Sequence, residues 1–440
     1  TTSNVVLVGD EAGKNINSTD ADGTVAIGYQ AGDAITSGQY NTAIGYQSLS
    51  AEDDGDGNTA VGYKALKAQT GTSGTVGNTA VGLQAGTAVT TGTRTTLMGY
   101  QAGLALTAPY ANVAIGYKAM GEGTTSSHTV AIGQNAFLKI STDGNAQRNV
   151  AIGSSAGEQM TNGMRATFIG YHAGSQYDSA NAFVNQTFIG SEVGYNHTSG
   201  GSNTLVGTQA LHGTSGFAGS HNTVVGALAG YGSDDMDKAV VIGSNALYGA
   251  TTSGADGTIA IGYEAGYNLT SGAANTIIGY RSARAATDSV GAAVTLGYEA
   301  MYSNTDSTGN VAIGYFALRQ ASGGSSRDYN IAIGTEAMRN ANGHISVAIG
   351  YTAGKFIKSG GSGVVHIGHA AGTYASGSGN TFMGYQSGHG GTTSAPYSSG
   401  QYNTAVGFQA FDAFTTADYS TAIGYNAGTA ITTGNSNTLL

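Results

Sequence analysis

One nine-residue pattern, N-[TV]-A-I-G-Y-x-A-[GL], recurs along the chain and constrains its fold more than any other feature. Twenty-four copies align on a central glycine, and examples are Gly45, Gly116, Gly262, Gly314 and Gly424. Eleven of the 23 spacings between successive central glycines are 17 residues, and the others run from 16 to 23 residues. A repeat of this length is typical of architectures in which each copy packs only against its neighbours.

Several positions of the pattern hold nearly constant residue types when they are numbered from the central glycine as position 0. Position −3 is always β-branched, position −2 is Ala in 13 copies, and position +3 is Ala in 20 copies. Position −1 is always a large aliphatic residue and is Ile in 15 copies, including Ile44, Ile115, Ile261, Ile313 and Ile423. Such residues before a glycine predict a short core strand that ends in a tight turn.

One short strand per repeat predicts an all-β solenoid with parallel strands, because stacked coils place their strands side by side. The many glycines exclude a helix, and the Ser, Thr, Gly, Asn and Asp of the variable segments indicate exposed loops. We expect a single continuous solenoid over residues 1–440, with coils of 16–23 residues. Residues 438–440 occupy the strand positions of a further copy, so we also expect the chain to be a fragment of a longer fibre.

Both faces of the expected strand are apolar, because successive strand side chains point to opposite faces. One face can fill the narrow interior of the coil, and this chain has no further residues to cover the other. Association with identical chains is the simplest way to bury that second face. We expect the β-branched and Ile columns to fill the roll and the Ala column to lie at the subunit contact, and the sequence leaves the opposite assignment open.

The composition restricts the partners and the chemistry. Forty percent of the residues are apolar, which argues against disorder. The formal charge is −10 and basic runs are absent, so we expect no nucleic acid partner. No apolar run approaches the length of a membrane span, so we expect no membrane insertion in this segment. Without cysteines, a phosphate-binding loop or a catalytic constellation, we expect no enzyme activity.

The repeats resemble the head repeats of trimeric autotransporter adhesins of the YadA type, as in residues 310–317, N-V-A-I-G-Y-F-A. That family forms a left-handed parallel β-roll that trimerises about a three-fold axis. The resemblance therefore implies a left-handed parallel β-roll (a β-solenoid) of about 24 coils in a homotrimeric fibre. Residues 403–410, N-T-A-V-G-F-Q-A, also resemble repeats of phage and marine-virus tail fibres. Adhesin coils are mostly shorter than these, which favours the tail-fibre branch.

These features predict an extracellular, non-enzymatic fibre. The leading hypothesis is the shaft of a phage or virus tail fibre that positions a receptor-binding tip. The alternative is the head or passenger of a bacterial trimeric autotransporter adhesin that binds host matrix or cells. Uniform coils and short neutral loops favour the shaft, and the long insertion at residues 389–402 is the best candidate for a lateral contact. A host-surface receptor or a glycan is the expected external partner.

Two side-chain columns have candidate roles. A tyrosine follows the central glycine in 13 copies, including Tyr46, Tyr117, Tyr263, Tyr315 and Tyr425. A stacked tyrosine ladder is the structural interpretation, and a carbohydrate-binding strip is the alternative. Asn stands at position −4 in 12 copies, where it can bond its own turn or form an amide ladder.

Two metal hypotheses remain, and we expect no other cofactor. Asp20 and Asp22 lie in one acidic turn, and Asp54 and Asp56 lie in another turn of the same register. Spaced aspartates beside a glycine can ligate Ca²⁺, and the alternative is a solvated turn. His366 interrupts a column that is otherwise apolar except for Thr295. If that column faced a three-fold axis, three copies of His366 could hold a metal or an anion; otherwise His366 is a structural histidine.

Overall fold

The computed structural model describes residues 4–16, 21–71, 74–140, 147–178, 184–214, 216–249, 255–287, 291–303, 308–319, 328–357, 361–394 and 397–440. Over these residues the chain forms short strands, bridges and turns, and no helix. It divides into two compact units, Thr1–His221 and Asn222–Leu440. Each unit is a parallel β-solenoid, and whether one continuous roll runs through both stays a prediction.

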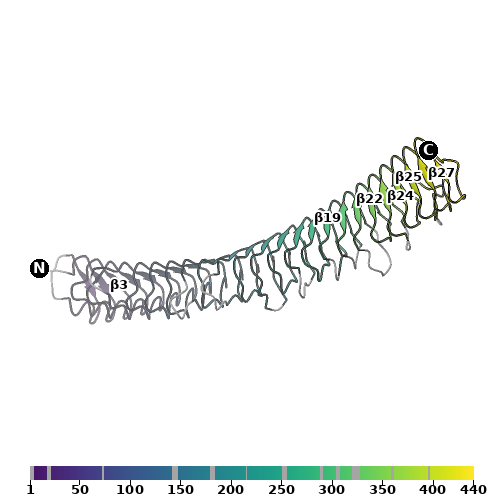
Figure 1. Cartoon of the computed structure of the whole chain (residues 1–440). Coiled ribbons are helices and arrows are strands. Elements are labelled where there is room, and N and C mark those ends of the chain that lie inside the picture. Colours follow the sequence, from purple (N-terminus) through teal and green to yellow (C-terminus); the bar gives the residue numbers. More distant parts are fainter. Residues whose placement is uncertain are drawn as a thin grey trace. The chain divides into compact units, whose positions relative to one another are not determined.

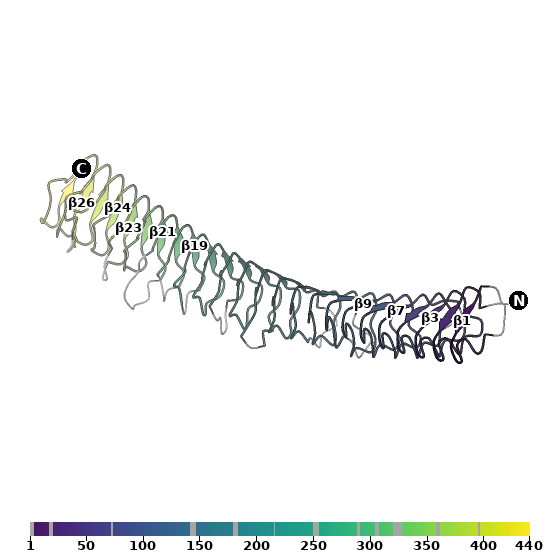
Figure 2. The ribbon, with the colours of Figure 1, turned by 180° about the vertical axis from the view of Figure 1, so that it is seen from behind.

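Unit 1 contains 12 three-residue strands, and each strand ends immediately before a central glycine. They are β1 (Val6–Val8), β2 (Val25–Ile27), β3 (Thr42–Ile44), β5 (Thr59–Val61), β7 (Thr79–Val81), β8 (Thr96–Met98), β9 (Val113–Ile115), β10 (Val130–Ile132), β11 (Val150–Ile152), β12 (Thr167–Ile169), β13 (Thr187–Ile189) and β14 (Thr204–Val206). The shorter strands β4 (Gly55–Asp56) and β6 (Gly74–Thr75) pair with each other. Figure 2 shows β1, β3, β7 and β9 following one another along this unit.

Unit 2 has the same construction, and Figure 1 shows β22, β24 and β25 in succession. Its 12 three-residue strands are β15 (Thr223–Val225), β16 (Val240–Ile242), β17 (Ile259–Ile261), β18 (Thr276–Ile278), β19 (Val294–Leu296), β20 (Val311–Ile313), β21 (Ile331–Ile333), β22 (Val347–Ile349), β23 (Val365–Ile367), β24 (Thr381–Met383), β25 (Thr404–Val406) and β26 (Thr421–Ile423). A two-residue strand, β27 (Thr438–Leu439), follows. The 24 three-residue strands of the described residues match the 24 copies counted in the sequence.

Neighbouring strands within a unit pair in parallel and in register, so each position of the repeat forms a column along the unit. In unit 1, Val25 lies opposite Thr42 and Ile27 lies opposite Ile44. In unit 2, Ile313 of β20 lies opposite Ile333 of β21. The predicted all-β parallel solenoid is therefore confirmed, whereas its left-handed sense and its trimeric state stay predictions.

The central glycines are required by both the backbone conformation and the stacking of coils. Gly45 has a φ of +132°, and a Cβ on it would lie 2.5 Å from the carbonyl oxygen of Gly62 in the next coil. Gly116, Gly262, Gly314 and Gly424 have φ values of +130° to +135°. An L side chain is strained at such φ values, and in the stacked coils it would also push the next turn away.

From β2 to β26, the interior of the coils is filled by the middle residue of the three-residue strand, position −2, and not by the Ile column, whereas Leu7 of β1 is 43% exposed. Ala43 and Ala312 are fully buried, whereas the neighbouring Ile44 and Ile313 are partly exposed. The same holds for Ile115 and Ile261, and Ile423 is 44% exposed. The expectation that the β-branched and Ile columns fill the roll is therefore wrong for the single chain. Position −2 shares a narrow interior with position +3, so small side chains fit there, and strand alternation turns positions −3 and −1 outward.

The side chains at positions −2 and +4 compensate for each other in size across this interior. In seven of the ten copies with Leu, Met or Phe at position +4, position −2 is Ala, as in the pair Ala60 and Leu66. Conversely, Phe382 at position −2 is matched by Gly388, where a Cβ would lie 2.3 Å from the Phe382 ring. This compensation was present in the sequence, and it indicates that the two positions face each other inside the roll.

The buried asparagines at position −4 join successive coils. Asn149 accepts the backbone N–H of Ala166 on Oδ1 at 2.9 Å and donates Nδ2 to the carbonyl of Gly163 at 2.9 Å. Asn403 makes the corresponding bonds to Ser420, at 2.9 Å, and Ala417, at 2.7 Å. In these copies the side chain bonds the backbone of the next coil, and not its own turn or another side-chain amide. The structural role predicted for this column is confirmed, and the predicted own-turn bond occurs in other copies, because Asn275 donates to the carbonyl of Gly272 at 2.8 Å and Asn380 donates to that of Gly377 at 3.1 Å.

Candidate functional site

The outward face of the strands is an apolar surface that repeats once per coil. It combines position −3, position −1 and the tyrosine at position +1, for example Val311, Ile313 and Tyr315. Tyr315 is 47% exposed, and several residues at position −1 are also more than one third exposed, namely Met98, Ile152, Leu296 and Met383. Contiguous apolar surfaces of this kind mark interaction sites on soluble proteins.

The tyrosines at position +1 stack on one another along each unit. The ring centroid of Tyr46 lies 5.2 Å from that of Tyr29 and 5.3 Å from that of Tyr63. In unit 2, Tyr263, Tyr280, Tyr298 and Tyr315 form one run with centroid separations of 5.4, 5.0 and 5.3 Å. The predicted ladder is confirmed in these runs, and further stacked pairs are Tyr100–Tyr117 and Phe408–Tyr425.

This stacking bears on the alternative of a carbohydrate-binding strip. A sugar ring packs against the face of an aromatic ring, and stacked rings cover each other's faces. Tyr46, Tyr280 and Tyr298 each have an aromatic neighbour on both sides. Inside these runs the tyrosines therefore present ring edges and hydroxyl groups, which does not favour binding by ring stacking.

The two acidic turns predicted as calcium ligands are not brought together. Asp20 lies outside the described residues. Asp22 and Asp56 occupy the same position in coils that have another coil between them, in which that position is Gln39. Two coil spacings amount to about 10 Å, too far for one shared ion. One oxygen of Asp56 accepts the backbone N–H of Gln39 at 2.7 Å, which ties it to the preceding coil.

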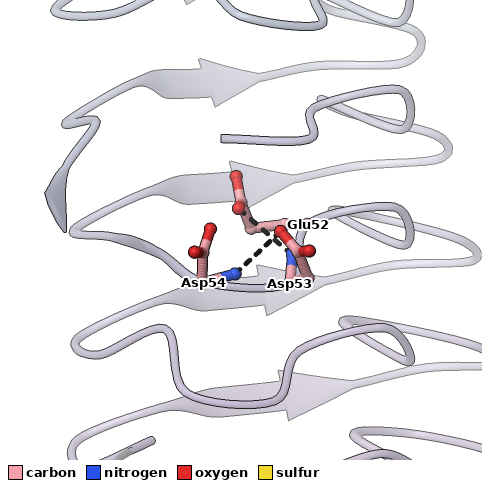
Figure 3. Close-up of side chains that lie close together, drawn as sticks. All are labelled: Glu52, Asp53 and Asp54. Atoms are coloured by element: carbon pink, nitrogen blue, oxygen red, sulfur yellow. Dashed lines mark hydrogen bonds between the residues drawn. The ribbon is translucent and has the colours of Figure 1, made fainter. Parts of the chain in front are cut away.

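Asp54 instead lies beside Glu52 and Asp53, and one oxygen from each carboxylate falls within 4.8 Å of the others (Figure 3). Glu52 is fully buried. Its Oε1 accepts the backbone N–H groups of Gly55 at 2.8 Å and Asp53 at 3.1 Å, and its Oε2 accepts that of Gly71 at 3.2 Å. Burial raises the pKa of the Glu52 carboxyl, and these hydrogen bonds oppose the shift. Three amides therefore occupy most of the roughly four lone-pair sites of this carboxylate, which leaves little for a cation.

His366 lies inside its own roll, so the hypothesis that it faces a three-fold axis between chains is wrong. The ring is fully buried at position −2 and stacks on Phe382 with centroids 5.0 Å apart. A Cβ on Gly372 would lie 2.3 Å from its Nδ1. Neither ring nitrogen has a hydrogen-bond partner among the described residues. Burial lowers the pKa of His366 to about 3, which keeps the ring neutral at pH 7.

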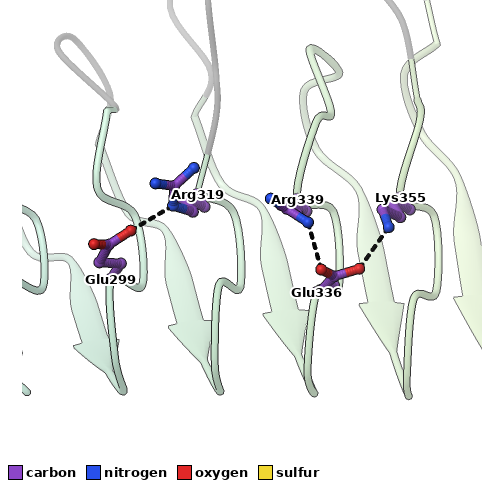
Figure 4. A network of polar contacts seen from close by, with 5 residues as sticks. All are labelled: Glu299, Arg319, Glu336, Arg339 and Lys355. Carbon is purple, nitrogen blue, oxygen red and sulfur yellow. Dashed lines mark hydrogen bonds and ion pairs between the residues drawn. The ribbon is translucent and has the colours of Figure 1, made fainter.

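A network of ion pairs on unit 2 was not predicted (Figure 4). Glu299 pairs with Arg319 of the next coil at 2.6 Å. Glu336 pairs with Arg339 and, at 2.5 Å, with Lys355 of the next coil. The sequence feature that could have indicated these ion pairs is a recurring Glu at position +2 together with Arg or Lys at position +5. These side chains are only 8–28% exposed. Surface pairs contribute about 0.2–1 kcal/mol each, so these contacts support the stacking of coils but do not form a reactive centre.

Neither a scan against protein-family models nor a search of curated proteins found a match to this chain. Across the described parts of the chain, no helix has the length and apolar character needed to cross a membrane. The repeat itself and the surfaces that it builds are therefore the basis for a functional proposal.

Proposed function

We propose that this chain is part of the shaft of an extracellular homotrimeric fibre, in which three copies bury their outward strand faces against one another. The observation that carries the proposal is the apolar outward column, which continues coil after coil while the interior is already filled by position −2. A partner that contacts this surface along its length must present groups that repeat at the same spacing as the coils. A second copy of the same chain has that period.

The resemblance to adhesin head repeats supports a trimer with left-handed coils, and the coil length favours a virus tail fibre over an adhesin. A bacterial adhesin head is the second candidate. It is favoured by the long coil at residues 389–402, where Tyr397 stacks on Phe356 with centroids 4.7 Å apart and lies 6.0 Å from Tyr374. This aromatic cluster could serve as a lateral contact with host matrix.

The mass of the purified chain tests the assembly. We expect light scattering to give three chains per particle, and a stable monomer contradicts the proposal. Ile313→Asp changes the outward face and should reduce association while the circular dichroism spectrum stays that of a β protein. Ala312→Asp places a carboxylate inside the roll and should unfold the local coils. Ala273→Asp, at an exposed loop residue, is the control and should change neither property.

Imaging separates the two biological roles. Antibody labelling of fibres on virions supports the tail-fibre proposal, and labelling of cell envelopes supports the adhesin. The sequence that flanks this chain gives an independent test. A membrane-barrel anchor after the repeats favours the adhesin, and neighbouring capsid or baseplate genes favour the tail fibre.

A further inference from the structure

One edge of unit 1 carries a row of exposed cations, and this row is independent of the strand face. The cationic edge consists of positions −6 and −5 in five consecutive coils, namely residues 93–94, 110–111, 127–128, 147–148 and 164–165. Its position −5 holds Arg94, Ala111, His128, Arg148 and Arg165, and all of these except Ala111 are exposed. The chain has only 16 Lys and Arg residues and a formal charge of −10, so three arginines in one column of five coils are a local concentration.

The backbone of the cationic edge is regular. Thr93, Tyr110, Ser127, Gln147 and Met164 are linked by successive parallel bridges, which form a second ladder on these coils. The N–H of Arg148 donates to the carbonyl of Ser127 at 3.1 Å, and that of Arg165 donates to the carbonyl of Gln147 at 3.2 Å. The side chains are therefore held at one coil spacing, about 4.8 Å, and the row spans roughly 19 Å.

The cationic edge has no acidic residue at either position, whereas position −6 of other coils is Asp, as in Asp22 and Asp56. Among the described residues, none of the ion pairs includes Arg94 or Arg148. Arg94 donates instead to the Tyr110 hydroxyl at 2.7 Å and lies 5.6 Å from that ring's centroid. Tyr110 is 38% exposed, so the edge combines guanidinium groups with an accessible aromatic ring.

We propose that the cationic edge binds an anionic polysaccharide. Arg94, Arg148 and Arg165 pair with its carboxylate or sulfate groups, and its sugar rings pack beside Tyr110. The planar guanidinium group donates two parallel hydrogen bonds that match such anions. A linear polymer that repeats the anion engages several arginines at once, so individually weak contacts add up. A nucleic acid is the competing polyanion, and single-stranded oligothymidine tests it.

The test compares two triple variants of the full chain. R94S/R148S/R165S removes the arginines of the edge, and Ser202 already occupies position −5 with a φ of +60°, so the backbone accepts serine there. K64Q/K67Q/K118Q removes the same charge from other positions, and both variants shift the formal charge from −10 to −13 (three fewer cations). Binding is measured against immobilised heparin, polygalacturonate, neutral dextran and single-stranded oligothymidine over a series of salt concentrations.

We expect the full chain to bind heparin or polygalacturonate and to ignore dextran. In the edge variant, the slope of log affinity against log salt should become shallower by about 2, and in the control variant it should stay unchanged. Heparin binding alone identifies sulfate as the recognised group, and polygalacturonate binding identifies carboxylate. The proposal is overturned if neither polymer binds, if both variants lose affinity equally, or if oligothymidine binds more tightly.

Light scattering on the edge variant separates this proposal from the fibre proposal. If binding is lost while the mass of the assembly is unchanged, the arginines face an external ligand. If the edge variant dissociates the assembly, the arginines pair with a neighbouring chain and the polysaccharide proposal fails. A wild-type chain that is monomeric but binds the polysaccharide contradicts only the fibre.

Discussion

The backbone N–H of Asn58 donates to the side-chain Oδ1 of Asn41, 17 residues earlier, at a distance of 2.8 Å. The Nδ2 of Asn41 donates in turn to the carbonyl of Gly55 at 2.7 Å. Asn78 repeats the arrangement one coil further on, because its N–H donates to the Oδ1 of Asn58 at 3.1 Å. These buried amides satisfy backbone groups that neither the strand ladder nor solvent can reach.

Asn41→Ala should therefore leave a buried N–H and a buried carbonyl without partners. Each orphaned group costs about 1–3 kcal/mol, so we expect a clear loss in the free energy of unfolding in urea. Gln47→Ala is the control, because that half-exposed amide bonds only the Gln30 side chain among the hydrogen bonds found for it, at 2.9 Å. Equal losses in the two variants would contradict the role of Asn41.

Gly314→Ala should destabilise the roll more than an alanine at a loop glycine. Gly314 has a φ of +132°, and the new Cβ would lie 2.6 Å from the carbonyl oxygen of Gly334. The strain is of order 1–3 kcal/mol before the next coil is displaced. Gly257 has a φ of +65°, and a Cβ added there would meet open space. Gly257→Ala should therefore cost only about 1–2 kcal/mol. Thermal melts that rank the two variants in the opposite order would refute this account.

His366→Phe should stabilise the roll, and the gain should grow in acid. Burial lowers the folded-state pKa of His366 from 6.5 to about 3. Below about pH 6.5 the unfolded chain therefore binds the proton more tightly, and stability falls as the pH drops. By pH 5 the loss from this residue is about 2 kcal/mol. His221→Phe, at an exposed position, is the control.

The measurement is the melting temperature of both histidine variants at pH 7.5 and pH 5. A gain for His366→Phe that is the same at both pH values contradicts the buried neutral ring. His197, which is also fully buried with a pKa lowered to about 3, is unchanged in both variants and keeps its own acid sensitivity.

Calcium should not stabilise the turn around Glu52. We expect no heat on calcium titration and no change in melting with a chelator, because three backbone N–H groups already engage this carboxylate. Glu52→Ala should lower the free energy of unfolding by about 1–3 kcal/mol, since the N–H of the buried Gly55 loses its acceptor. Asp53→Ala, at an exposed carboxylate, should have a much smaller effect. A melting temperature that rises with calcium would support the calcium hypothesis instead.

The positions of the strands and of the turn glycines could be predicted from the sequence, because 24 copies repeat the same local chemistry. The sequence could not show which face of the strand points into the roll, because Ala43 and Ile44 lie on opposite faces and are both apolar. In the sequence, the size compensation between positions −2 and +4, as in Phe382 and Gly388, is the feature that distinguishes the two faces. The incorrect placement of His366 has the same origin. His366 occupies position −2, and the sequence did not show that this column points into the roll.

The ion pairs and the cationic edge depend on how coils of unequal length are stacked. Glu299 and Arg319 are 20 residues apart and meet only because one coil closes on the next. Arg148 and Arg165 both occupy position −5, so the repeat pattern already places them in one column, and the parallel bridges confirm this register. The repeat pattern alone does not show which side chains of neighbouring coils reach each other, since Glu299 and Arg319 occupy different positions, +2 and +5.

Hydrogen bonds between adjacent coils join residues that are close in sequence, such as the pair 17 residues apart at Asn41 and the pair 23 residues apart at Asn380 and Asn403. Contact order within a unit is therefore low, and no segment must wait for a distant partner. A finished coil can act as the template for the next while the ribosome is still extending the chain. Synthesis of such a chain should therefore expose little unfolded polypeptide at any moment, whatever its final length.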